Sequence, residues 1–138
     1  MPPTPHDPDD PAEWIRRARS NLARARGDRI HPDVLYEDLC FDAQQAAEKA
    51  LKELLLHRAV PFPWTHSIGG LLALVAQAGM EPPEGVREAS VLTDYAAQAR
   101  CPGRVEEVSR EDDLTAVELA ERVVGWVETI VSTSPPLR

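Results

Sequence analysis

The densest set of side chains capable of binding chemistry lies within one stretch of otherwise apolar residues. Gln44, Gln45, Glu48, Lys49 and Lys52 follow one another at helical spacing, so a helix would make them neighbours. Amide groups can read the edge of a base, and an ammonium group can hold a phosphate. Spacing alone favours a simpler interpretation, a solvated helix face with a Glu48–Lys52 ion pair, and leaves a nucleotide-binding groove as the alternative.

Two further candidates lie near predicted helix ends. His66 directly precedes an expected helix N-terminus, where free backbone N–H groups attract anions. It can bind phosphate or act as an acid or base, or it can simply pack against the turn. Arg100 ends a later predicted helix, and it either complements the helix dipole or binds phosphate together with Tyr95 of the same helix.

Metal and phosphate-loop chemistry receive little support. Glu53 and His57 are four residues apart, but two ligands do not make a metal site. Gly69 and Gly70 lack the lysine and the spacing of a phosphate-binding loop. The sequence therefore predicts neither a metal nor a cofactor.

Apolar periodicity places these residues on helices. Capping and breaking signals divide the 138 residues into helices expected over 11–26, 32–59, 67–78, 84–99 and 110–131. No strand pattern occurs, so we predict an all-α fold, an antiparallel four-helix up-and-down bundle with one additional short helix. Residues 11–132 would form the bundle, with its core built from the four longer helices, and residues 1–10 and 133–138 would be tails.

Charge and composition narrow the function classes. The formal charge of −8 argues against a protein that coats nucleic acid by bulk electrostatics, although residues 16–29 hold six arginines that could form a local anion site. We see no signal peptide and no run of about 20 apolar residues, so we expect a cytoplasmic protein without a membrane partner. Cys40 and Cys101 form no close pair and are interpreted as free thiols.

Three segments resemble the HEPN family. The stretch from Cys40 to Lys52, with paired glutamines and Ala-Glu-Lys-Ala-Leu-Lys, is similar to the signature of the family's long helix. Thr65-His66-Ser67-Ile68 is similar to the segment that opens the third helix. Leu92-Thr93-Asp94-Tyr95 and then Arg100-Cys101-Pro102 resemble the Leu-x-x-Tyr and Arg-Tyr-Pro segments, with Cys101 in place of the usual tyrosine.

The resemblance implies a helical domain that often dimerises and is commonly encoded beside a small nucleotidyltransferase, the two forming a toxin–antitoxin pair. Many members are metal-independent RNases with an Arg-x4–6-His motif near the fourth helix. This chain has no histidine after His66, so the motif is absent from its usual place. Arg26 and His31 have the required spacing, but they lie between the first two predicted helices. We therefore favour a non-catalytic binding module that forms a homodimer, partners a nucleotidyltransferase and binds a nucleotide or RNA.

The residues expected to line that site are Gln44, Gln45, Lys49, His66, Tyr95 and Arg100. One alternative is a metal-independent endoribonuclease toxin, in which His66 would be catalytic together with Arg100 or Arg58. The other is an oligomerisation adaptor without a ligand.

Overall fold

The computed structural model describes residues 10–93 and 108–133, and all of the regular secondary structure within these ranges is helical. Its elements are α1 (Pro11–Arg26), α2 (Tyr36–His57), α3 (Ile68–Gln77), α4 (Glu84–Arg87), the 3₁₀ helix η1 (Glu88–Val91) and α6 (Arg110–Thr133). The prediction of an all-α fold is confirmed, and the described residues form five α-helices and one short 3₁₀ helix. Nearly all of the predicted tails, together with Cys101, fall outside the described residues.

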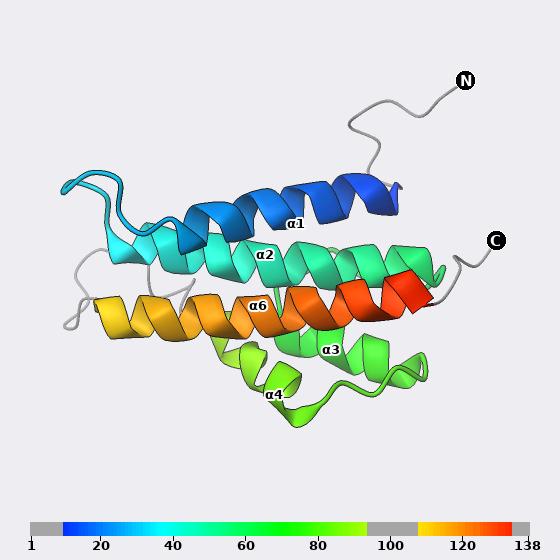
Figure 1. Cartoon of the computed structure of the whole chain (residues 1–138). Coiled ribbons are helices and arrows are strands. Elements are labelled where there is room, and N and C mark those ends of the chain that lie inside the picture. The colour runs from blue at the N-terminus through cyan, green and yellow to red at the C-terminus, as the bar shows by residue number, and fades with distance from the viewer. Residues whose placement is uncertain (1–9, 94–107, 134–138) are drawn as a thin grey trace, which may run out of the picture.

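Helix α2 is the centre of the molecule. Helices α1 and α6 lie along it, and α3 and α4 are on the opposite side from α1 (Figure 1). The side of α2 that meets its neighbours is rich in alanine, which lets helix axes approach closely, and its leucines fill the remaining space. The fully buried members of this set are Ala43, Ala46, Ala47, Ala50, Leu51, Leu54 and Leu55. The broad apolar band on this helix explains why it contacts several others.

Three helices begin where their capping residues predict. The Asp10 carboxylate accepts a hydrogen bond from the Ala12 N–H at 3.0 Å, and the Ser67 hydroxyl accepts one from the Gly70 N–H at 3.0 Å. At the start of α6 the exchange is reciprocal, because the Ser109 hydroxyl accepts from the Asp112 N–H and the Asp112 carboxylate accepts from the Ser109 N–H. These bonds satisfy donors that a helix N-terminus otherwise leaves free.

Removing the Ser109 cap should weaken α6. We expect Ser109→Ala to lower the free energy of unfolding by about 1 kcal/mol, because the Asp112 N–H loses its acceptor. Ser109→Thr retains a hydroxyl and should lose far less. Urea denaturation followed by circular dichroism measures both variants, and equal losses would show that the cap contributes nothing specific.

Glu13 does not complete the capping box that its position suggests. Its carboxylate instead binds Arg16 at 2.7 Å and Arg17 at 2.8 Å, on the next turn of α1. The hydrogen bond from Arg16 is the main reason that the pKa of Glu13 falls to about 2. Part of the basic stretch expected on the first helix is therefore neutralised within that helix.

Helix α2 begins at Tyr36 rather than at residue 32. The preceding segment forms turns instead, in which the Val34 N–H donates to the His31 carbonyl at 3.0 Å and the Asp33 N–H donates to His31 Nδ1 at 3.1 Å. Asp28 has a φ of 56°, which no α-helix contains. These turns let the chain reverse between α1 and α2.

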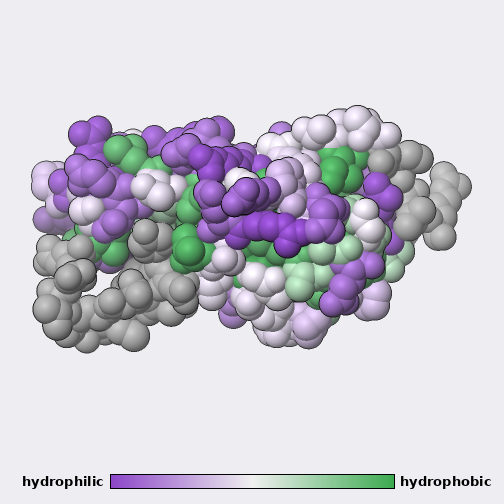
Figure 2. Space-filling model, turned by 90° about the horizontal axis from the view of Figure 1, so that it is seen from below, coloured by the Kyte–Doolittle hydropathy of each residue, from purple (hydrophilic) through white to green (hydrophobic). Residues whose placement is uncertain are grey.

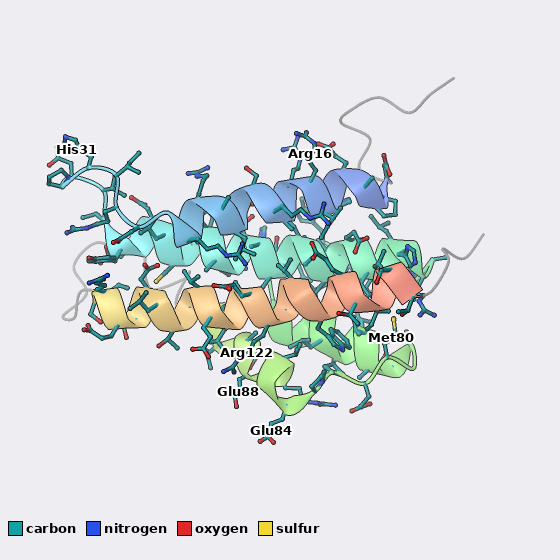
Figure 3. The ribbon with its side chains drawn as sticks, viewed as in Figure 1. Arg16, His31, Met80, Glu84, Glu88 and Arg122 are labelled. Carbon is teal, nitrogen blue, oxygen red and sulfur yellow. The ribbon has the colours of Figure 1, made fainter. Side chains whose placement is uncertain are left out.

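The single helix predicted over residues 84–99 is also wrong in its first half. Four α-helical residues are followed by four in 3₁₀ conformation. Within the 3₁₀ segment Ala89 is fully buried, and Glu88 accepts a hydrogen bond from Arg122 of α6 at 3.1 Å (Figure 3). The tighter winding lets the segment contact α3 and α6 together. Residues 94–99 lie outside the described residues.

The outer surface on the side of α3 and α4 is mixed. Hydrophilic side chains run across the middle of this face, with smaller apolar patches beside them (Figure 2). Among the described helices, none is both long and apolar enough to cross a membrane. Cys40 is a free, fully buried thiol, and burial raises its pKa to about 12, so it stays protonated.

Candidate functional site

A buried carboxylate on α2 organises the candidate site. The side chain of Glu48 is only 3% exposed, yet each of its oxygens has a partner. One oxygen is 2.9 Å from Nδ1 of His66 and accepts a hydrogen bond from the Gln44 amide at 3.2 Å. The other is 3.4 Å from the ammonium nitrogen of Lys52. Burial makes each of these interactions stronger than it would be in water.

The glutamines extend this network to the backbone. The Gln44 amide nitrogen also donates to the His66 carbonyl at 3.2 Å, and so ties α2 to the loop that precedes α3. The Gln45 amide donates to the Gln44 oxygen at 2.8 Å. The structure thus brings Gln44, Gln45 and His66 into one connected set through Glu48.

Lys52 is a buried cation enclosed by aromatic rings. Its residue is 1% exposed, and its ammonium nitrogen lies 4.9 Å from the ring centre of Trp64, 5.5 Å from Trp14 and 6.0 Å from Phe62. Such faces attract cations electrostatically. Glu48 and Lys52 do form the expected ion pair, but they lie inside the protein and not on a solvated face.

His66 and Trp64 are the exposed parts of this assembly. The His66 side chain is 68% exposed and Trp64 is 80% exposed. Because an ionised carboxylate only accepts hydrogen bonds, Nδ1 of His66 is the donor in the contact with Glu48. The imidazole is therefore oriented through Nδ1 while most of its side chain meets solvent.

The N-terminus of α3 contributes less than its position suggests. The Gly70 N–H donates to the Ser67 hydroxyl, and the Ile68 N–H donates to the Thr93 hydroxyl at 3.0 Å. Two donors that would otherwise attract an anion are already occupied. An anion at this point would depend on His66 more than on the helix end.

Lys49 belongs to a neighbouring network between α1 and α2. Its ammonium group donates to the Asn21 side-chain oxygen at 2.7 Å, and the Asn21 amide donates to Asp42 at 3.0 Å. Burial, followed by repulsion from Arg17, lowers the pKa of Lys49. A pocket of about 570 Å³ adjoins this network, and Gln45 lines it together with Lys49. Gln45, which bonds to Gln44, therefore borders both networks.

The remaining expected residues, Tyr95 and Arg100, lie outside the described residues. Among the described residues, no group of three or more His, Cys, Asp or Glu side chains is arranged to hold a metal ion.

Sequence reasoning missed two features of the site, the role of Glu48 and that of Trp64. Glu48 has the correct helical spacing to Gln44 and Lys52, but nothing local indicates that all three are buried. A tryptophan in a proline-rich loop, two residues before the candidate histidine, was the available signal for Trp64.

Comparison with known proteins places the chain in a family. The family model for the HEPN domain matches residues 11–130. The crystal structure of an archaeal HEPN homologue superposes with a TM-score of 0.65 at 27% sequence identity, covering 88% of this chain and 97% of that one. No curated protein gives a significant match. Since the matched region is most of the sequence and the helical architecture agrees, the chain belongs to the HEPN domain family.

Proposed function

We propose that this HEPN domain is a binding module for a nucleotide or a short single-stranded segment of RNA. The observation that carries the proposal is the contact between buried Glu48 and exposed His66, beside exposed Trp64. The buried carboxylate orients the imidazole, although 68% of the His66 side chain is exposed to solvent. This contact prepares a polar ring for a ligand.

The chemistry of the two exposed rings suits nucleic acid components. An open indole face can stack on a base, which is the main way that proteins hold unpaired bases. The imidazole can then contact a phosphate or the edge of the base through Nε2. Because Trp64 also packs against the Lys52 ammonium group, its ring is held on one side and open on the other.

We expect His66→Ala and Trp64→Ala each to weaken binding of a single-stranded RNA oligonucleotide roughly tenfold, the effect of losing one stacked or hydrogen-bonded base. Fluorescence anisotropy with a labelled oligonucleotide measures the affinities. His31→Ala is the matched control, since His31 is exposed in the loop between α1 and α2 at one end of the bundle (Figure 3). Equal affinities for His66→Ala and His31→Ala would refute the proposed site.

A second candidate function has one observation in its favour. A histidine oriented by a carboxylate is the arrangement of many general bases, and Nε2 of His66 could take the proton of a 2′-hydroxyl. Incubating the purified protein with RNA and chelator separates the two functions. The binding module predicts intact RNA, whereas cleavage that His66→Ala abolishes would identify a metal-independent RNase toxin and replace our proposal.

The proposed partners follow from the family. HEPN domains commonly dimerise, and we propose a homodimer that works with a nucleotidyltransferase in a toxin–antitoxin pair. Light scattering on the purified chain reports its oligomeric state, and co-purification with a nucleotidyltransferase encoded beside it tests the pairing. If nucleotides and RNA leave the melting temperature unchanged while the oligomer persists, an oligomerisation adaptor is the better description.

A further inference from the structure

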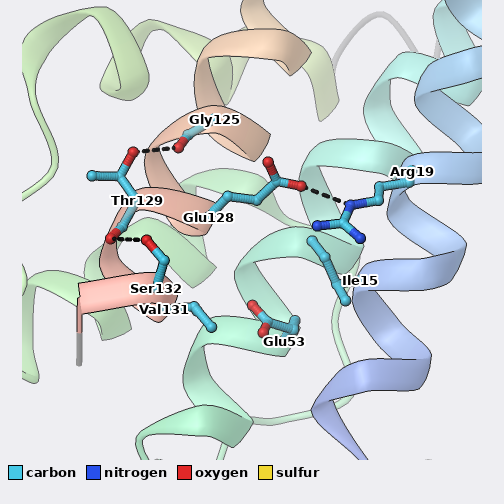
Figure 4. A pocket seen from close by; sticks show the side chains of 8 residues that line it. All are labelled: Ile15, Arg19, Glu53, Gly125, Glu128, Thr129, Val131 and Ser132. Atoms are coloured by element: carbon cyan, nitrogen blue, oxygen red, sulfur yellow. Dashed lines mark hydrogen bonds and ion pairs between the residues drawn. The ribbon is translucent and has the colours of Figure 1, made fainter. Parts of the chain in front are cut away.

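A second pocket lies away from His66, along the seam between α1 and α6, with α2 as its floor. Its volume is about 480 Å³, and side chains from all three helices line it (Figure 4). Helices α1 and α6 both pack more extensively on α2 than on each other, so the seam between them stays partly open. The residues at its floor and walls are of both polar and apolar kinds.

Glu53 of α2 is the unusual residue of this pocket. It is 3% exposed, and its Oε2 has no hydrogen-bond partner within the described part of the chain. Leaving a buried carboxylate oxygen unpaired costs free energy, and burial raises the pKa of Glu53 to about 7, with Arg19 of α1 opposing this rise and Glu128 of α6 adding to it. Nothing in the packing of the bundle calls for an acid at this position. A ligand with a positive charge would remove the cost.

The other charged groups of the pocket are already paired with each other. Arg19 Nε donates to Glu128 at 2.8 Å, and the same arginine only partly offsets the cost of a charge on Glu53. With two carboxylates and one guanidinium group, the pocket carries a net negative charge when Glu53 is ionised. Anions are therefore unsuitable ligands, and a single positive charge balances the site.

The remaining walls suit a short carbon chain. Figure 4 shows the Glu53 carboxylate between Ile15 and Val131, whose apolar side chains border the same space. The hydroxyls of Thr129 and Ser132 donate to helix carbonyls at 2.9 and 3.0 Å, which leaves their oxygens able to accept a hydrogen bond from an ammonium group.

Gly125 keeps one wall of the pocket open. A glycine inside a helix is less stable than alanine by about 0.5–1 kcal/mol. A Cβ atom built on Gly125 would meet nothing within 4 Å, so no close contact requires this glycine. Because Gly125 lies on the pocket wall, we interpret this glycine as keeping the pocket open for a ligand.

We propose that this pocket binds a small aliphatic amine in its cationic form, with the ammonium group paired to Glu53 and the carbon chain against Ile15 and Val131. The site is separate from the Glu48–His66 network, and the inference does not depend on the proposed function. A small cationic metabolite or a polyamine end has this chemistry.

The test uses the whole chain and three probes of equal length, butylammonium, butanol and butyrate. Near pH 8 we expect saturable binding of butylammonium in NMR titrations, with butanol and butyrate bound at least about tenfold more weakly, since a buried ion pair is lost in both cases. Binding of butylammonium should weaken as the pH falls through about 7, because Glu53 then takes up a proton.

Variants locate the binding. Glu53→Gln should weaken butylammonium binding at least about tenfold, and Gly125→Leu should do the same by filling the pocket, while Gly125→Ala confirms that α6 tolerates a side chain there. Glu118→Gln is the matched control, because Glu118 is an exposed acid of α6 that pairs with Arg122. Butanol binding as tightly as butylammonium, or unchanged binding by a folded Glu53→Gln variant, would overturn the proposal.

Discussion

Lys52→Met is expected to lower the free energy of unfolding by about 3–5 kcal/mol, the range seen when one partner of a buried ion pair is removed. Methionine fills a similar volume but leaves Glu48 buried without its cation at 3.4 Å. The aromatic rings around Lys52 also lose the ammonium group that they surround. Since natural domains unfold at a cost of only about 5–15 kcal/mol, this loss is a large share of the total. Urea denaturation measures it directly.

Two comparisons make the result specific. Glu48→Gln combined with Lys52→Met removes both charges, and we expect this double variant to be more stable than Lys52→Met alone, with a coupling energy of about 1–3 kcal/mol in the double-mutant cycle. Lys49→Met is the matched single change on the same helix. Lys49 is less buried and its described partner is the neutral Asn21, so about 1 kcal/mol should be lost. Similar losses at both lysines would show that the ion pair is not what stabilises this region.

The ends of several helices could be read from the sequence because their signals are local. Asp10 and Pro11 start α1, Gly27 follows its last residue, and Ser109 with Asp112 starts α6. Each of these signals acts within one turn of backbone, and a short window of sequence contains all the groups involved. The alanine and leucine pattern of α2 likewise identifies the central helix.

The first residue of α2 and the interruption after α4 could not be predicted, because groups far apart in the sequence contact both places. Val108 donates its N–H to Glu37, 71 residues earlier, at 3.1 Å, and Arg122 donates to Glu88, 34 residues earlier. Periodicity cannot show such contacts. A proline at residue 32 is compatible with the first turn of a helix, but this segment forms turns and the helix begins only at Tyr36.

In the candidate site too, contacts within one helix could be predicted from the sequence and contacts between distant segments could not. Helical spacing correctly makes Gln44, Glu48 and Lys52 neighbours, since each is one turn from the next. Their burial depends on α1 and on the loop between α2 and α3, which no local pattern reveals. For the same reason the link from Glu48 to His66, 18 residues later, emerges only from the structure.

Asp113→Asn is expected to raise the free energy of unfolding by on the order of 2 kcal/mol near pH 8. Asp113 is 3% exposed, and its Oδ1 has no hydrogen-bond partner among the described residues. Burial raises the pKa of Asp113 from 3.8 to about 6. The negative charge of Asp28 adds a smaller rise, and the positive charge of Arg110 opposes it. Because the folded chain holds this proton more tightly than the unfolded chain, the ionised carboxylate destabilises the fold above about pH 6.

The sign of the pH dependence distinguishes the effect of Asp113 from the pH dependence of the rest of the protein. Between about pH 4 and 6 the folded state binds more protons at Asp113 than the unfolded state, so the contribution of this residue to stability falls as the pH rises through that window. The advantage of Asp113→Asn should therefore shrink to a few tenths of a kcal/mol near pH 4 and reach its full size above pH 6. Denaturation curves at a series of pH values give the difference in the free energy of unfolding between variant and wild type. The titration of Glu53 is common to both proteins and cancels in this difference.

Asp112→Asn is the matched control, one residue away on the same turn of α6. Asp112 is only half-buried, and its carboxylate accepts the Ser109 N–H at a helix N-terminus, where negative charge is favourable. This variant should lose about 0.3–1 kcal/mol near pH 8, opposite in sign to Asp113→Asn. If both variants lost stability, the buried carboxylate would have a stabilising partner that outweighs its burial. If the gain of Asp113→Asn were the same at all pH values, it would come from packing rather than from charge.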